Sequence, residues 1–352
     1  MKKGILCLAI ATAITSAGMP TVAHGEETLE SAQARYDSAV AQYNLGSAGF
    51  FQYLANQGDA DAKQAYDIIT AEDNSLQDGS KQTVDYSVYT QLGAANDATN
   101  LENMKKAVDE LNDVNTYRKK ENTTEGTNLV DLKVTSSLMA ISQYQLNYSK
   151  GVAGHSQAFN VSENIAWGYS NPFDGWYDDE KAEFKKGNVS AAGHYLNIVN
   201  KSYTTMGYSY VAGSGVQYGS AYGQTFDYSL TRSFTGNAVS VTEYKAKFNT
   251  YYNAVKQELA DAKKALEDAG VTVPDQNNPE EETPNISDNS GTTSSGTTAS
   301  GSNNAGTSNA GTVSQKDSAI KDTAAEGNYM VLISLMACGL AFVAVVGKKR
   351  RA

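Results

Sequence analysis

Apolar residues recur at spacings of three and four over several long stretches of the chain, which is the period of an amphipathic helix. The pattern predicts four long helices, at 28–54, 101–121, 132–148 and 242–270. The first and last of these carry apolar seams of the same near-heptad kind, so we expect them to pack together beside the central domain. The rest of the N-terminal helical region, 26–99, is polar and predicts short helices and loops.

Shorter patterns lie between the third and fourth helices. Short helical pieces are predicted around 163–167 and 173–184, and another begins near His194. Aromatic and β-branched runs predict strands at 206–212 and 222–228, and an edge strand at 231–241. The chain therefore combines helices with a small number of strands.

The two ends of the chain have the composition of targeting and anchoring segments. Residues 1–25 resemble a signal peptide, with Lys2 and Lys3 before an apolar run. A Pro/Gly/Ser/Thr-rich stalk is expected at 271–320, because that composition cannot bury a core. The apolar run 329–347 is long enough for a transmembrane helix, and the basic residues that follow it are expected to stay cytoplasmic.

Residues 320–324, Ile320-Lys321-Asp322-Thr323-Ala324, resemble a degenerate sortase signal of the Leu-Pro-x-Thr-Gly type, which Gram-positive bacteria use to join proteins to the cell wall. A plain membrane anchor is the alternative. Either way, we expect an exported protein held at the cell surface by its C-terminus.

Charge and cysteine content narrow the possible functions. The formal net charge is −11, and six of the basic residues lie in the two terminal segments, so the remainder is more acidic still. Such a surface argues against nucleic acid as a partner. The two cysteines, Cys7 and Cys338, also lie in the terminal segments, which excludes disulfides and thiol chemistry from the part between them.

Two histidines remain once the predicted leader, which holds His24, is set aside. Each follows a glycine, in Gly154-His155 and Gly193-His194, which indicates a tight turn or a close backbone approach beside each imidazole. Glu163 and the run Asp178-Asp179-Glu180 lie between them. Neutral imidazoles with one or two carboxylates are a ligand set for zinc, so this stretch is the candidate chemical centre.

Six segments occur in an order that is characteristic of one family. They are Asn115-Thr116-Tyr117-Arg118, Gly154-His155, Glu163-Asn164-Ile165-Ala166, Trp176-Tyr177-Asp178-Asp179, Gly193-His194-Tyr195 and Gln224-Thr225-Phe226. In this order they resemble the motifs of the CAP superfamily, which includes cysteine-rich secretory proteins, insect venom antigens and pathogenesis-related plant proteins. The resemblance covers residues 100–231, the expected CAP (SCP-like) domain.

The resemblance implies an α+β fold, an α-β-α sandwich in which helices cover a small antiparallel sheet. It implies that four residues face one cleft and can bind a divalent metal, often zinc: His155, Glu163, Asp179 and His194. It also implies fold-supporting roles for Asn115, Arg118, Asn164, Trp176, Tyr195 and Gln224. Asp179 is shorter than the family's glutamate by one carbon–carbon bond, about 1.5 Å, so Glu180 is the possible substitute ligand.

The residues leave three roles open for this set: binding a metal, fastening loops through His–carboxylate hydrogen bonds, or activating water for hydrolysis. The functional hypotheses are accordingly a surface-displayed binding or interaction module with an unidentified extracellular ligand or protein partner, a metal-assisted hydrolase of peptides or wall polymers, and a lipid or sterol carrier. A serine hydrolase would call on Ser156 or Ser162, for which no spacing supports a triad. We favour the binding module over an enzyme because the ordered motifs accompany a stalk and an anchor.

Overall fold

The computed structural model describes residues 28–77, 84–227 and 238–273. The leader, the sortase-like segment, the apolar run 329–347 and nearly all of the predicted stalk lie outside these residues, as does most of the predicted edge strand at 231–241. Within the described residues, no helix has both the length and the apolar character required to span a bilayer.

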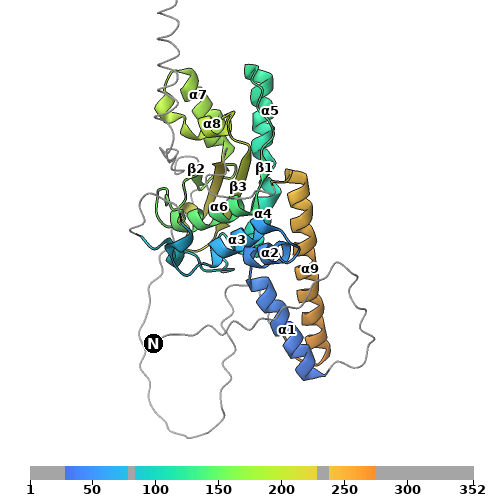
Figure 1. The fold of residues 1–352 in the computed structure, drawn as a ribbon. Coiled ribbons are helices and arrows are strands. Elements are labelled where there is room, and N and C mark those ends of the chain that lie inside the picture. The colour runs from blue at the N-terminus through green and yellow to red at the C-terminus, as the bar shows by residue number, and fades with distance from the viewer. Residues whose placement is uncertain (1–27, 78–83, 228–237, 274–352) are drawn as a thin grey trace, which may run out of the picture.

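The described chain begins with helices alone, and its strands follow from residue 133 onward (Figure 1). In order, the elements are α1 (Leu29–Asn44), α2 (Ser47–Ala55), α3 (Ala60–Thr70), η1 (Asn74–Leu76), η2 (Tyr86–Tyr89), α4 (Leu101–Glu110), α5 (Asp113–Glu125), β1 (Lys133–Val134), α6 (Ser136–Ser149), β2 (Ser162–Trp167), η3 (Asp174–Asp179), α7 (Glu180–Lys185), η4 (Val189–Ala191), α8 (Gly193–Ile198), β3 (Thr205–Ala212), η5 (Gln217–Gly219), β4 (Ser220–Asp227) and α9 (Val241–Asp268).

A four-stranded sheet with the order β1-β3-β4-β2 forms the centre. β3 pairs antiparallel with β4, β4 pairs antiparallel with β2, and the short β1 runs parallel to β3. Helix α6 packs on one face, where Gly207 of β3 is so close to the α6 backbone that a Cβ would lie 2.0 Å from the carbonyl oxygen of Leu138. Helix α4 packs against β3, and helix α8 packs against β2. The α+β fold class is therefore confirmed, although the sheet is not wholly antiparallel.

The predicted helical piece at 163–167 is wrong, because these residues form strand β2. The side chains from Glu163 to Trp167 are all buried, polar and apolar alike, so the segment lacks the alternation that marks a half-buried strand. The local pattern of a short, fully buried segment does not distinguish a strand from a helix. Pairing with β4 decides it, with Asn164 opposite Gln224 in the register.

The predicted helix at 101–121 is divided into α4 and α5 at Leu111 and Asn112. Both residues keep right-handed helical φ and ψ, so the helical period of the sequence continues through the break. Asn100 caps α4, and its side chain accepts hydrogen bonds from the N–H groups of Glu102 and Asn103. The helix predicted from 132 begins only at Ser136, since 133–134 pair with β3.

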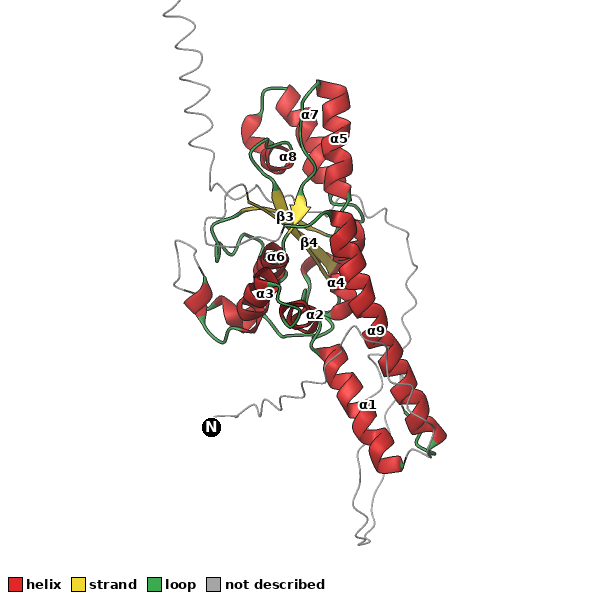
Figure 2. Ribbon diagram, turned by 45° about the vertical axis from the view of Figure 1, so that its right-hand side comes forward, coloured by secondary structure: helices red, strands yellow, loops and turns green. Residues whose placement is uncertain are grey.

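Helices α1 and α9 lie side by side as an antiparallel two-helix arm that projects from the domain (Figures 1 and 2). Arg35 of α1 makes a bidentate contact with Glu258 of α9, at 2.8 and 3.1 Å. Nearer the domain, Gln42 donates a hydrogen bond to the Tyr251 hydroxyl at 2.8 Å. Helix α2 approaches α9 closely at Gly49, where a Cβ would lie 2.2 Å from that hydroxyl.

Candidate functional site

Glu163, near the start of β2, pairs with His155 in the preceding loop. Nδ1 of His155 lies 2.6 Å from Oε2 of Glu163. The two side chains are 8 % and 2 % exposed, so the pair is almost closed to solvent. Helix α6 supports the pair, because Nε2 of Gln145 donates to Oε1 of Glu163 at 2.9 Å. Ser149, one turn further along α6, donates to the carbonyl oxygen of Gly154 and so holds the loop at the glycine before His155.

His194 at the start of α8 pairs with Glu180, the residue expected only as a substitute. Nδ1 of His194 lies 2.6 Å from Oε1 of Glu180. The other oxygen, Oε2, accepts hydrogen bonds from the backbone N–H groups of His194 and Tyr195, at 2.8 and 3.0 Å. Glu180 therefore holds both the ring of His194 and the first turn of its helix.

The side chain of Asp179, in contrast, is exposed on the surface. The reason is the helical type of η3, Asp174–Asp179, which is a π-helix. A π turn contains one more residue than an α turn. The fourth residue after Trp176 therefore takes about the direction that the third would take in an α-helix. The chain thus presents Glu180 to His194, and the family spacing of Trp-x-x-Glu becomes one residue longer.

Each glutamate faces Nδ1 of its histidine and leaves Nε2 of the ring directed elsewhere. A neutral ring that donates from Nδ1 to a carboxylate carries its lone pair on Nε2. Nε2 of His194 is buried and has no hydrogen-bond partner among the described residues. His194 also borders a narrow space whose volume of about 0 Å³ has no room for a water molecule. The other residues around it are Ile165, Ala166, Tyr169, Gly175, Trp176 and Glu180. A nitrogen lone pair in this position can accept an N–H or O–H group or ligate a metal.

Both pairs border strand β2, which lies at the edge of the sheet. Asn164, next to Glu163, donates to the backbone carbonyl of His194 at 3.3 Å. Two carbonyl groups of β2 are capped by side chains: Asn197 donates to Glu163 at 3.4 Å, and the indole N–H of Trp176 donates to Ile165 at 3.0 Å. These bonds fix α8 and η3 to the strand and occupy groups that an edge strand would otherwise expose.

A buried carboxylate on α5 holds the helices that carry Glu180 and His194. Glu121 accepts hydrogen bonds from Tyr177 and Tyr195, both at 2.6 Å, and from Lys181 at 2.7 Å. Burial opposes ionisation of Glu121, but these three donors outweigh it and lower the pKa of this carboxyl below its ordinary value. Tyr177 and Lys181 lie within three residues of Glu180, and Tyr195 directly follows His194. Glu121 therefore holds the chain on both sides of the contact between Glu180 and His194.

The remaining residues of the predicted set lie in the core around the same elements. Asn115 binds both the N–H and the carbonyl of Leu132, at 2.8 and 3.0 Å. Arg118 donates to backbone carbonyl groups that include that of Ile198 at the end of α8, at 2.6 Å, and burial lowers its pKa to about 10. Gln224 is fully buried in β4. The sequence did not single out Gln145 or Glu121, because neither lies in a family motif.

Of the two serines considered as nucleophiles, Ser162 shares a hydrogen bond of 2.5 Å with the hydroxyl of Tyr203. The Ser156 hydroxyl accepts from the backbone N–H of Ala158 at 3.3 Å. Both hydroxyl groups thus contribute to the local packing of the loop and strand.

Each His–Glu pair has the hydrogen-bond pattern that is common around metal-ligating histidines. Metal-ligating histidines usually donate their other ring N–H to a carboxylate, which is how both glutamates bind the rings here. Nε2 of His155 and His194 would then be the ligand atoms, while Glu163 and Glu180 orient the rings. In the described part of the chain, no three His, Cys, Asp or Glu side chains form a group that could hold a metal ion.

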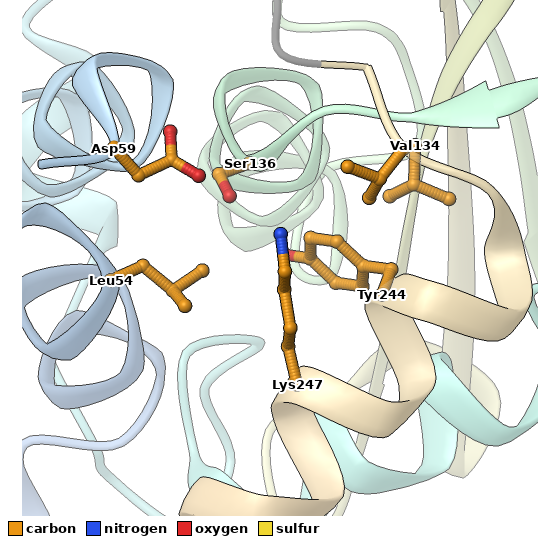
Figure 3. A pocket seen from close by; sticks show the side chains of 7 residues that line it. Leu54, Asp59, Val134, Ser136, Tyr244 and Lys247 are labelled. Atoms are coloured by element: carbon orange, nitrogen blue, oxygen red, sulfur yellow. The ribbon is translucent and has the colours of Figure 1, made fainter. Parts of the chain in front are cut away.

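A separate pocket lies between α2, α3, α6 and α9 (Figure 3). The side chains of Ser136 and Lys247 reach toward the same space, beside Tyr244 and opposite Asp59 (Figure 3). Its volume of about 10 Å³ is enough for roughly one water molecule. None of the residues that line it belongs to either His–Glu pair. The His–Glu pairs remain the candidate site, because they carry the motif histidines and the buried Nε2 of His194 that has no partner among the described residues.

Comparison with known families places both pairs in one matched segment. Residues 111–228 match the model described as CAP, the cysteine-rich secretory protein family. The match begins at the turn between α4 and α5 and ends just after β4, so it contains the described sheet and the π turn but not the two-helix arm. No curated protein and no solved structure matches the chain. The resemblance that the motifs indicate over 100–231 is thus confirmed for 111–228.

Proposed function

We propose that the chain is an extracellular binding module, displayed at the cell surface, whose CAP-like part binds a divalent metal, zinc in the first instance, through Nε2 of His155 and His194. The buried Nε2 of His194, which has no hydrogen-bond partner among the described residues, carries the proposal. A buried polar atom normally has such a partner, so an atom that has none is a candidate to bind a ligand. When bound, the metal would supply Lewis acidity or a structural link between the two rings.

Display at the surface is supported by the arrangement of the arm. The described chain enters at the start of α1 and leaves at the end of α9, and both points lie at the tip of the arm (Figure 1). Helices α7 and α8 lie at the opposite end of the molecule (Figure 1). A chain exported by its leader and tethered beyond 273 would hold the arm between its anchor and the His–Glu pairs. The pairs would then face outward, toward an extracellular partner.

Zinc titration of the full-length chain, followed by calorimetry, tests the metal part. We expect one site in the wild type and at least a 100-fold loss of affinity when both His155 and His194 are changed to alanine. Glu180→Gln should weaken binding by about 10- to 100-fold, as loss of an orienting partner does. Asp179→Asn is the matched control and should leave the affinity unchanged. Unchanged affinity in the double histidine variant would refute the metal site.

A peptidase assay on the same samples separates binding from catalysis. The binding module predicts no turnover that depends on the metal. Hydrolysis that is lost on chelation and also in Glu163→Gln, with the fold intact, would favour a metal-assisted hydrolase instead.

A further inference from the structure

The ring of His194 is closed to solvent, and its Nε2 atom is buried. The narrow space beside the ring has a volume of about 0 Å³, so it holds neither water nor a ligand in this conformation. Anything that reaches Nε2 must therefore first displace a side chain. Of the seven described residues around the space, six are buried and only Tyr169 is partly exposed.

The other walls of the space are held in place. Ile165 and Ala166 belong to strand β2, which pairs with β4. The indole N–H of Trp176 donates to the carbonyl oxygen of Ile165 at 3.0 Å. Glu180 lies 2.6 Å from Nδ1 of His194 and also accepts two backbone N–H groups of α8. These walls can move only at the cost of buried hydrogen bonds.

Tyr169 lies over Gly175, which belongs to the η3 turn. A Cβ on Gly175 would lie 2.9 Å from the hydroxyl oxygen of Tyr169 and 3.0 Å from its Cζ, so the tip of the ring takes the place of a side chain at this position. The backbone is anchored on both sides of the ring: Gly168 donates to the carbonyl of Ser220 at 2.9 Å, and Gly175 donates to that of Pro172 at 3.2 Å. Rotation of a partly exposed side chain needs no change in this backbone.

We propose that Tyr169 is a lid over His194, and that rotation of its ring away from Gly175 opens a path for small solutes to Nε2. The value of this path for metal binding rests on the proposed function, but the lid itself does not. Gly175 is the seat of the lid, because a side chain at this position would hold the ring away from the η3 turn.

Acylation by diethyl pyrocarbonate tests the lid without any metal. The reagent modifies an imidazole nitrogen that it can reach, and peptide mapping of the full-length chain by mass spectrometry measures the rate at His194. We expect Tyr169→Ala to raise this rate by about tenfold or more, because it removes the local opening step. Tyr169→Phe keeps the ring and should react at a rate close to that of the wild type. His155 does not border the space and is the internal reference.

Gly175→Ala moves the lid without changing Tyr169. Its methyl group would displace the tip of the ring, so we expect faster acylation of His194 in this variant as well. An unchanged rate in Tyr169→Ala, with the fold intact by circular dichroism, would overturn the lid. A rate in Tyr169→Phe as high as in Tyr169→Ala would also overturn it, because the ring would then not be the barrier.

Gly207→Ala is the control for global unfolding. The substitution strains the contact between β3 and α6 but leaves the residues around His194 unchanged. If acylation of His194 rises as much in this variant as in Tyr169→Ala, the reagent enters by unfolding and the lid is wrong. Zinc calorimetry is read separately: faster acylation in Tyr169→Ala without zinc binding contradicts only the metal site, and zinc binding with unchanged acylation contradicts only the lid.

Discussion

Replacement of Glu180 by alanine tests the conclusion that the π turn presents this residue, and not Asp179, to His194. The carboxylate of Glu180 makes three close contacts, with Nδ1 of His194 and with two backbone N–H groups. His194 and Tyr195 are 1 % and 4 % exposed, so water cannot readily replace the lost acceptor. Asp179, one residue earlier, is exposed.

The expected cost follows from these contacts. Each buried donor left without an acceptor costs about 1–3 kcal/mol, and removal of one partner from a buried charged pair costs about 3–5 kcal/mol. Because the three contacts share one carboxylate, their costs do not add fully. We therefore expect Glu180→Ala to lower the free energy of unfolding by about 4 kcal/mol, a large part of the roughly 5–15 kcal/mol typical of a domain. Asp179→Ala should change it by no more than about 0.5 kcal/mol, as at other surface positions.

Urea unfolding followed by tryptophan fluorescence is a suitable assay. The ring centroid of Trp176 lies 6.2 Å from that of His194, so its emission reports on this region. Parallel circular dichroism shows whether the whole fold is lost in the same transition. An Asp179→Ala variant that is destabilised as much as Glu180→Ala would refute the assignment of the second acid.

Three further predictions concern the packing around the site and at the base of the arm. The pKa of Glu121 is lower in the folded protein than its ordinary value of 4.5. Its contribution to stability is therefore complete above pH 4.5 and is lost as the pH falls below that value. Urea unfolding between about pH 3 and 6 should show a fall in the free energy of unfolding that is smaller in Glu121→Gln than in the wild type. Gly207→Ala should cost about 3 kcal/mol by the same assay, because its Cβ would meet the backbone carbonyl of Leu138, which cannot turn aside; a neutral effect would contradict this close packing. Gly49→Ala should destabilise the protein by about 1–2 kcal/mol, because the added Cβ collides with the Tyr251 hydroxyl and this outweighs the better helix propensity of alanine. Thermal unfolding measures the effect, and a higher unfolding temperature in the variant would contradict the close contact between α2 and α9.

The sequence was sufficient for the features that depend on near neighbours along the chain. The three-and-four spacing of apolar residues predicts α9, and Asn100 predicts the start of α4, because period and capping are local properties. The order of short motifs identifies His155, Glu163 and His194 as residues of one region. The same motifs indicate the CAP-like domain, without any knowledge of how its elements pack.

Tertiary structure alone decided the features that depend on partners distant in sequence. Residues 163–167 become a strand because β4 offers a hydrogen-bonding edge, which no local pattern records. The choice of Glu180 over Asp179 depends on one additional residue in the η3 turn, and a shift of one residue changes the direction of every later side chain. Gln145 contacts the site only because α6 packs beneath the loop of His155. A side chain's place along the chain was readable from the sequence, whereas its direction was set by the packing of the elements around it.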